Sequence, residues 1–295
     1  MFPDFTEERI AANGVTLFVR RSPVTGKPPL LLLHGYPQTG AMWHKVAGDL
    51  AQDFDLVIPD LRGYGRSDKP PSDPEHATYS KRAMARDMVA LMRGLGYDRF
   101  HVGAHDRGGR VAHRMGMDHP EAVIAMTILD IAPTREMYAN TDADFARAYW
   151  HWFFLIQPHP LPETMIGTDP DAYWRLKCCD VPGSDAPFAH AALEEYLSCF
   201  RDPAAIRASC EDYRAAYTTD IAHDDSDDGA RLSMPIQVLW GAHGVIERCF
   251  DCLALWRLRS ENVVGRALPS GHYMAEEIPD QISAAMRDFF TTHKG

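Results

Sequence analysis

Asp106 is the residue of this chain best placed to act as a nucleophile. It lies in the run GAHDRGG, residues 103–109, which follows a short apolar segment and begins a helical one. Small residues at positions 104 and 108 permit a nucleophile elbow, a tight strand-to-helix turn, although position 104 is Ala where Gly is usual. A carboxylate there can attack a saturated carbon and form an ester, and the helix dipole favours its ionised form. The alternative is that Asp106 only caps the helix.

Two arginines follow Asp106 closely. Arg107 and Arg110 are three residues apart, so on a helix both guanidinium groups lie on one face beside Asp106. Two arginines can hold a carboxylate through bidentate, charge-assisted hydrogen bonds. We therefore expect a substrate that carries a carboxylate. The alternative is a pair of surface ion pairs, but a buried elbow is a poor place for unpaired charge.

Short apolar runs and turn signals predict the strands that would position these residues. Asn13-Gly14 is a hairpin signal between runs at 9–12 and 15–20. Continuous apolar runs of this length suit strands buried on both faces, as in a parallel sheet. The five runs are residues 29–33, 56–59, 100–103, 125–129 and 235–240, and a last short strand should end near 268.

Helical patterns alternate with these strands at residues 79–95, 110–117 and 282–290. This alternation predicts a doubly wound α/β core with a mostly parallel central sheet flanked by helices. The rhythm breaks at an aromatic cluster, residues 149–154, and a proline-rich turn, residues 157–162. We interpret residues 134–217 as an inserted helical cap, and residues 1–133 and 218–295 as the core.

Composition excludes some partners. The chain has 41 acidic and 30 basic residues, a formal net charge of −11, and no basic tract, so nucleic acid is not an expected partner. No apolar run reaches the roughly 18 residues that a membrane span needs. An acidic protein that binds a carboxylate must concentrate positive charge locally, as Arg107 and Arg110 would.

Cysteine usage favours a reduced compartment. Residues 1–4 precede a polar stretch rather than an apolar one, so we expect no signal peptide and a cytoplasmic location. Residues 249–252 fit a C-x-x-C pattern, but without a second pair at metal spacing we expect neither a zinc site nor a redox site. The six cysteines are Cys178, Cys179, Cys199, Cys210, Cys249 and Cys252.

The chain resembles the haloacetate and fluoroacetate dehalogenases of the α/β-hydrolase superfamily over nearly its whole length. The most specific matches are HDRGGR at 105–110, YWHW at 149–152 and CEDYRA at 210–215, with support from LDIAPT at 129–134 and SGH at 270–272. The resemblance implies an α/β-hydrolase fold, no metal or organic cofactor, and a homodimer.

The general base is expected to be His272, because in this fold the histidine comes last in chain order. The chain has 14 histidines, and only its position in the chain distinguishes His272 from the rest. Many relatives place the acid after the strand at 235–240, but no carboxylate stands at that place, and Glu247 and Asp251 come later. We therefore predict that Asp130 orients His272, the alternative being that Asp130 caps a turn.

The loop HGYP, residues 34–37, follows a strand and resembles the one that supplies an oxyanion donor in α/β-hydrolases. We assign the donors to the backbone N–H groups of Tyr36 and Arg107, although HGYP could also be a plain turn. Epoxide hydrolases and haloalkane dehalogenases usually carry Trp where this chain has Arg107. That difference favours an anionic substrate.

By resemblance, His151, Trp152 and Tyr213 form a halide pocket. Imidazole N–H, indole N–H and phenol O–H are all donors, and donors aimed at a leaving halide stabilise charge only as it develops. The alternative is that the aromatic run merely packs the cap against the core.

The predicted reaction has two steps. The arginines hold a haloacetate while Asp106 displaces halide and forms an ester. His272, oriented by Asp130, then activates water, which hydrolyses the ester to glycolate. The partners are thus a small haloacid and water.

Two other functions are compatible with much of this pattern. An epoxide hydrolase would share the aspartate and histidine and could use Tyr213 or Tyr149 as acids, but Arg107 disfavours a neutral substrate. A non-catalytic ligand-binding member of the fold is the second alternative, against which the intact nucleophile, acid and base weigh. The halogen preference, the acceptance of longer 2-haloacids, the oligomeric state and the role of the cysteines stay open.

Overall fold

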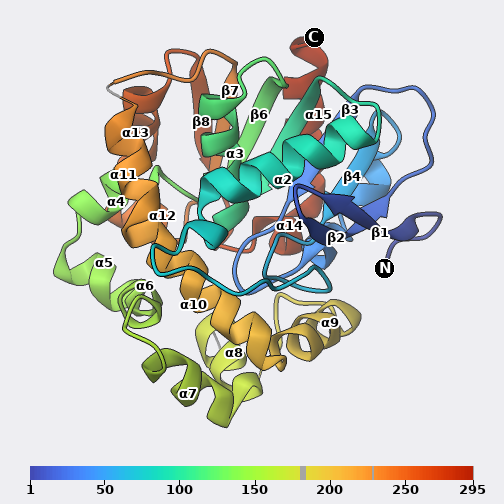
Figure 1. Ribbon diagram of the computed structural model, residues 1–295. Helices are drawn as coiled ribbons and strands as arrows, with labels where there is room; N and C mark the ends of the chain where they lie inside the picture. The colour runs from blue at the N-terminus through green and yellow to red at the C-terminus, as the bar shows by residue number, and fades with distance from the viewer. Residues whose placement is uncertain (180–183, 228, 295) are drawn as a thin grey trace.

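A computed structural model describes residues 1–179, 184–227 and 229–294. Its described strands form one sheet in the order β1-β2-β4-β3-β5-β6-β7-β8 (Figure 1). β2 is antiparallel to both its neighbours, and the strands from β4 to β8 are mutually parallel. The strands are β1 (Thr6–Ala12), β2 (Val15–Arg21), β3 (Pro29–Leu33), β4 (Asp55–Pro59), β5 (Phe100–His105), β6 (Val123–Leu129), β7 (Ile236–Gly241) and β8 (Val263–Leu268).

The predicted strands and hairpin are confirmed. Asn13 and Gly14 have φ values of 48° and 80° and join β1 to β2, as expected for a two-residue turn whose twist matches that of the strands. β4 and β5 are buried along their whole length, which explains why they read as continuous apolar runs rather than as alternating ones.

Helices cover both faces of the sheet. α2 and α3 lie in front of it in Figure 1, and α15 lies behind it. α3 begins three residues before the predicted stripe, because its first turn contains Gly108 and Gly109, which show no apolar periodicity. The core helices are α1 (Ala47–Leu50), α2 (Lys81–Gly94), α3 (Arg107–Asp118), α12 (Val245–Cys249), α13 (Cys252–Arg259), α14 (Met274–Glu277) and α15 (Pro279–Thr292), with 3-10 turns η1 (Gly40–Trp43) and η2 (Ala77–Tyr79).

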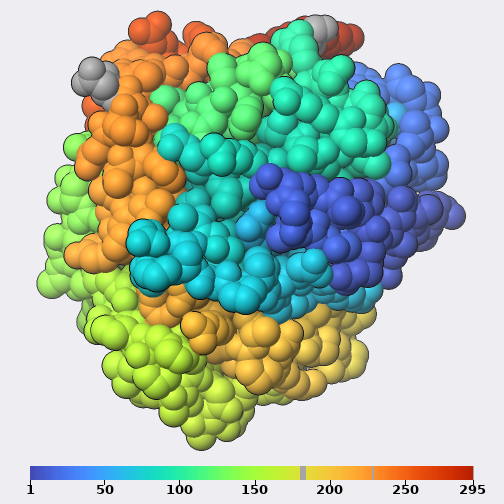
Figure 2. All heavy atoms as spheres, in the orientation of Figure 1, coloured from blue at the N-terminus to red at the C-terminus, as the bar shows by residue number. Residues whose placement is uncertain are grey.

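A helical insertion stands between β6 and β7. In Figure 1, α6 to α9 lie at the lower end of the molecule, α4 and α5 lie along its left side, and α10 and α11 extend upward toward α13. Figure 2 shows the inserted segment packed against the core along their common boundary. The division of a cap from the core at residue 217, between α10 and α11, stays a proposal. The helices are α4 (Thr134–Ala139), α5 (Ala143–Ala148), α6 (Trp150–Leu155), α7 (Leu161–Thr168), α8 (Pro170–Cys178), α9 (His190–Phe200), α10 (Pro203–Tyr217) and α11 (Thr219–Ser226).

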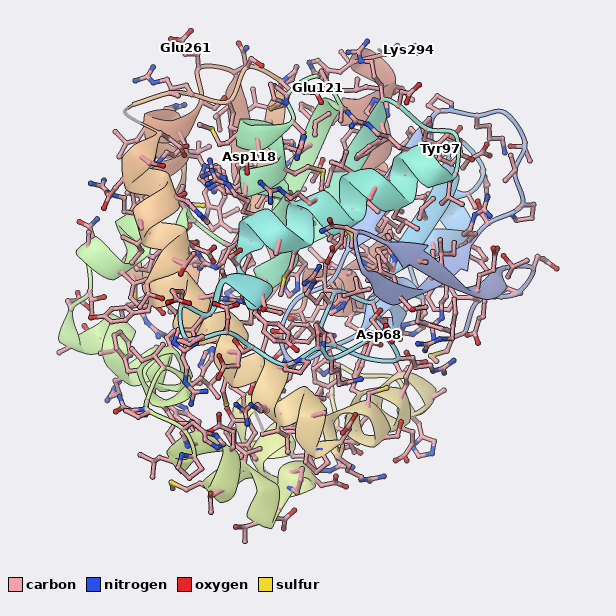
Figure 3. The ribbon with its side chains drawn as sticks, viewed as in Figure 1. Asp68, Tyr97, Asp118, Glu121, Glu261 and Lys294 are labelled. Carbon is pink, nitrogen blue, oxygen red and sulfur yellow. The ribbon has the colours of Figure 1, made fainter. Side chains whose placement is uncertain are left out.

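The parallel strands point toward this insertion. Glu121 and Glu261, which precede β6 and β8, lie at the end of the molecule away from the insertion, as does Lys294 (Figure 3). The carboxyl ends of the strands therefore meet the inserted helices. In open α/β sheets, ligands bind at this edge.

Candidate active site

Loops at the carboxyl ends of four strands bring the predicted residues together. Tyr36 follows β3, Asp106 follows β5, Asp130 follows β6 and His272 follows β8. Asp106 and Asp130 are almost completely buried. Both also have positive φ values, 46° and 48°. Non-glycine residues rarely adopt this conformation, and it tends to occur at functional sites.

The elbow fixes one oxygen of the Asp106 carboxyl. The backbone N–H of Tyr36 donates to Asp106 Oδ1 at 2.9 Å, whereas the N–H of Arg107, the second expected donor, makes no hydrogen bond to Asp106 within the described part of the chain. Gly108 is needed for close packing, since a Cβ there would lie 2.6 Å from the carbonyl oxygen of His34.

Gly35 makes room for the nucleophile. A Cβ at position 35 would lie 2.5 Å from Asp106 Cβ and 2.8 Å from Oδ1. The HGYP loop is therefore more than a turn, because its glycine allows the backbone to approach the Asp106 side chain.

Gly35→Ala should lower kcat about a hundredfold, because the new methyl group must displace the Asp106 carboxyl from its position. The measurement is steady-state turnover beside the melting temperature. Gly48→Ala is the matched control, since a Cβ there meets nothing within 4 Å. Equal activity of the two variants would show that the close approach at Gly35 is unimportant.

Asp130 is the carboxylate that contacts His272. His272 Nδ1 lies 2.6 Å from Asp130 Oδ2, and the N–H of Gly241 donates to Asp130 Oδ1 at 2.9 Å. The two other candidate acids are engaged elsewhere. Glu247 accepts from the Trp240 indole, and Asp251 caps α13. The assignment of Asp130 as the orienting acid thus agrees with the geometry.

His105 fixes the backbone beside the expected base. Its Nε2 lies 2.8 Å from the carbonyl oxygen of His272, and the two ring centroids are 4.6 Å apart. Burial, with a smaller effect from the charge of His272, lowers the pKa of His105 to about 3. A neutral His105 therefore donates one hydrogen bond to the His272 loop.

The electrostatics of the elbow keep the nucleophile ionised. Burial alone would raise the pKa of the Asp106 carboxyl. The electrostatic influence of His272 opposes this most, followed by those of His105 and Arg107 and by the Tyr36 N–H, so the pKa lies below its ordinary value. A carboxylate is the form that can attack carbon.

Arg107 is already ion-paired. Its Nε and Nη2 donate to the two carboxylate oxygens of Asp212 at 3.0 and 2.7 Å. Lys81 also contacts Asp212, and it lies 3.6 Å from Asp220. Lys81 and Arg107 thus balance Asp212 and Asp220, all of them buried. Of the three guanidinium nitrogens of Arg107, Nη1 is the one that makes no hydrogen bond to a described residue.

Arg110 differs from Arg107 because no carboxylate pairs with it in the described ranges. Its guanidinium carbon lies 4.5 Å from the centre of the Trp152 ring, Nη1 donates to the Thr134 hydroxyl, and Nη2 lies 3.4 Å from Met137 Sδ. Burial, followed by the charge of Arg107, lowers the pKa of Arg110 to about 10. The group is a buried cation at neutral pH that lacks an anionic partner.

The three predicted halide donors lie close together. The His151 and Trp152 rings, on α6, lie 5.9 and 6.5 Å from that of Tyr213 on α10. His151 Nδ1, Trp152 Nε1 and the Tyr213 hydroxyl are buried and have no hydrogen-bond partner in the described protein. Buried polar groups are normally paired. Such a set is therefore expected where a ligand supplies the missing partner.

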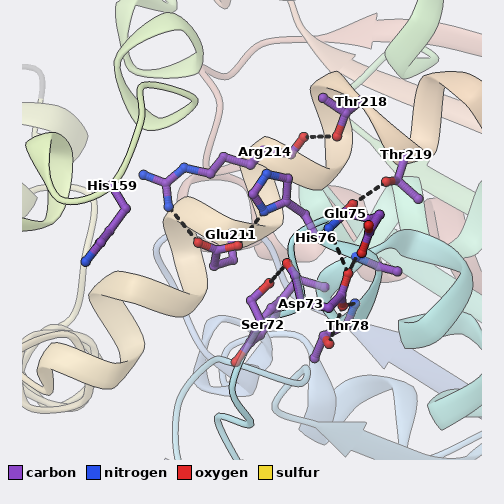
Figure 4. Close-up of polar contacts among 12 residues, drawn as sticks. Ser72, Asp73, Glu75, His76, Thr78, His159, Glu211, Arg214, Thr218 and Thr219 are labelled. Atoms are coloured by element: carbon purple, nitrogen blue, oxygen red, sulfur yellow. Dashed lines mark hydrogen bonds and ion pairs between the residues drawn. The ribbon is translucent and has the colours of Figure 1, made fainter.

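An outer ionic network holds α10 in place. Figure 4 shows Glu211 and Arg214 on the side of α10 that faces His76. His76 Nδ1 lies 2.6 Å from Glu211, and Arg214 donates to Glu211 and to Glu163 of α7 at 2.7 Å each. Asp212 and Tyr213, which lie between Glu211 and Arg214 in the sequence, are buried in the interior of the site.

Sequence reasoning missed Lys81, Asp212 and Asp220. Asp212 lies inside the CEDYRA motif, directly before Tyr213, and that neighbour was the one signal that could have pointed to it. Nothing in the local pattern marks Lys81 or Asp220, because their partners are distant in sequence.

Two further observations concern metal ions and membranes. In the described ranges, no group of three or more His, Cys, Asp or Glu side chains is arranged to hold a metal ion. None of the described helices is long and apolar enough to cross a membrane.

Known proteins share this fold and much of this sequence. The alpha/beta hydrolase fold family matches residues 28–273. A fluoroacetate dehalogenase from Burkholderia sp. is 44% identical over 99% of this chain and 95% of its own. A soluble epoxide hydrolase from Corynebacterium sp. (strain C12) is 31% identical over 89% of this chain and 90% of its own.

The solved structures agree. An α/β hydrolase from Nostoc sp. PCC 7120 superposes with a TM-score of 0.95 at 49% identity and covers 99% of each chain. These matches confirm the predicted fold and the predicted resemblance to fluoroacetate dehalogenases. The chain therefore belongs to the α/β-hydrolase fold family and is a hydrolase.

Proposed function

We propose that this hydrolase removes halide from haloacetates, including fluoroacetate, through an ester on Asp106. The observation that carries the proposal is Arg110, a buried cation beside the nucleophile that no carboxylate pairs with in the described chain. A substrate carboxylate would supply the missing charge. The fluoroacetate dehalogenase relative supports the same substrate class.

In the first step, Asp106 attacks the carbon that bears the halogen. Because Tyr36 holds Oδ1, Oδ2 is the oxygen free to attack. The carbon–halogen bond breaks, and the halide leaves with the electron pair toward the donors of His151, Trp152 and Tyr213. Burial holds the pKa of His151 well below its ordinary value, so a neutral imidazole supplies a single N–H.

In the second step, water hydrolyses the ester. His272, oriented by Asp130, takes a proton from water, and the resulting hydroxide attacks the Asp106 carboxyl carbon. Negative charge develops on Oδ1, where the Tyr36 N–H already donates. Collapse releases glycolate, which takes the proton back from His272. The overall products are glycolate, halide and one proton.

Halide release tests this function. Wild-type enzyme should release fluoride from fluoroacetate and chloride from chloroacetate, whereas Asp106→Ala should release neither. Ion-selective electrodes measure both halides, and a small epoxide is assayed in parallel because of the epoxide hydrolase relative. Chloride without fluoride would limit the proposal to weaker carbon–halogen bonds. Epoxide opening without either halide would replace it.

We also propose a cytoplasmic homodimer, with residues 134–217 as the cap that covers the substrate. Cys178, Cys199, Cys210, Cys249 and Cys252 are free thiols, which suits a reduced compartment. Light scattering of the purified protein determines the oligomeric state.

A further inference from the structure

We propose that Tyr138 is an additional substrate-binding residue, whose phenol O–H donates a hydrogen bond to the substrate carboxylate beside Arg107 and Arg110. The inference rests on the proposed function and deepens it. It adds a specificity residue that neither the motifs nor the resemblance assigned.

Helix α4 places Tyr138 next to Arg110. Thr134 and Met137 of the same helix contact the two terminal nitrogens of Arg110. Residues 134 and 138 are i and i+4 on a helix and share one face. Tyr138 therefore belongs to the face of α4 that covers Arg110.

Aromatic packing orients the Tyr138 ring. Its centroid lies 4.9 Å from that of Trp152 and 5.2 Å from that of Tyr217. The indole of Trp152 also contacts the guanidinium of Arg110 at 4.5 Å. One indole thus packs against both the arginine and the tyrosine.

The hydroxyl of Tyr138 lacks a partner. Its oxygen is buried and makes no hydrogen bond to any described residue, although a buried hydroxyl without a hydrogen bond is costly. Burial raises the pKa of this phenol to about 12, and the charges that oppose the rise most are Arg107 and Arg110. The group is therefore a neutral O–H close to both guanidinium groups.

An anionic acceptor is the group that fits this position. Arg107 Nη1 and Arg110 Nε are also buried donors without partners among the described residues. A carboxylate offers about four acceptor sites on two oxygens, enough for these two N–H groups and the phenol. The halide already has the donors of Trp152 and Tyr213, so we assign Tyr138 to the carboxylate end of the substrate.

Tyr138→Phe tests the assignment because it removes one oxygen and keeps the ring. KM for chloroacetate and for fluoroacetate should both rise about tenfold, as expected for one hydrogen bond to a charged group. The inhibition constant of acetate, which has the carboxylate but no halogen, should rise by the same factor. The melting temperature should stay equal or rise, because an unpartnered buried hydroxyl is removed.

Tyr217→Phe is the matched control. It removes a phenol from the same aromatic cluster, but Tyr217 is half exposed. KM, the acetate inhibition constant and the melting temperature should not change in this variant.

Three results would overturn the inference. One is an unchanged KM and an unchanged acetate inhibition constant. Another is a larger loss of kcat for fluoroacetate than for chloroacetate with acetate binding unaffected, which would assign the O–H to the halide. The third is a clear fall in melting temperature, which would make the hydroxyl structural.

If wild type releases no halide, calorimetry can still compare acetate binding by wild type and by Tyr138→Phe. Failure of the proposed function is therefore distinct from failure of this inference.

Discussion

His272→Gln should release one halide per active site and then stop. Without the base that activates water, the ester on Asp106 forms but is not hydrolysed. Steady-state turnover should fall by about a thousandfold or more. Rapid-quench assay of chloride measures the burst, and mass spectrometry of the intact protein should find an added carboxymethyl group that maps to Asp106.

His119→Gln is the control, because His119 lies outside the site and pairs only with Glu121 among the described residues. It should turn over as wild type does. A His272→Gln enzyme that shows neither burst nor adduct would mean that His272 is needed before the ester forms, or that no ester forms at all. Either outcome would contradict the two-step mechanism.

Arg110→Met should lower kcat/KM for haloacetates about a hundredfold to a thousandfold. The loss follows from removing the charge that a buried carboxylate needs. Turnover of chloroacetamide, which has no charge, should change much less. The melting temperature should not fall, because the substitution removes a buried cation that no described carboxylate compensates.

The pH profile gives a second measure of the same residue. Arg110 is protonated below its pKa of about 10, which burial and the charge of Arg107 have lowered. For wild type, kcat/KM for haloacetates should therefore fall as pH rises through about 10, and Arg110→Met should lack this limb. Arg86→Met, at an exposed position on α2, is the control. Equal losses for chloroacetate and chloroacetamide would argue against Arg110 as the carboxylate-binding charge.

The sequence predicted the parts of the fold that depend on local patterns. Apolar runs indicated the parallel strands, and Asn13-Gly14 indicated the hairpin, because burial on both faces and positive φ leave direct traces in residue type. The elbow motif rather than apolar periodicity indicated the start of α3, because the first turn of this helix carries glycines instead of apolar side chains.

The sequence allowed us to predict which residues form the site, but not which of their charges are paired. Asp106, Asp130 and His272 each end or follow a strand, so chain order was enough to propose that they meet. That Asp212 neutralises Arg107 while Arg110 keeps an unpaired charge depends on contacts between residues about a hundred positions apart. No local pattern encodes such contacts. The two arginines therefore read as equivalent in the sequence but are not equivalent in the structure.

Because the Tyr36 N–H donates to one oxygen of the Asp106 carboxylate, the two oxygens would have different fates during turnover. Oδ1, which the N–H holds, would remain in the protein through each cycle of the proposed mechanism. The other oxygen would leave as the hydroxyl of the product and be replaced from solvent. The enzyme would thus pass its own oxygen to each product molecule and take a new one from water.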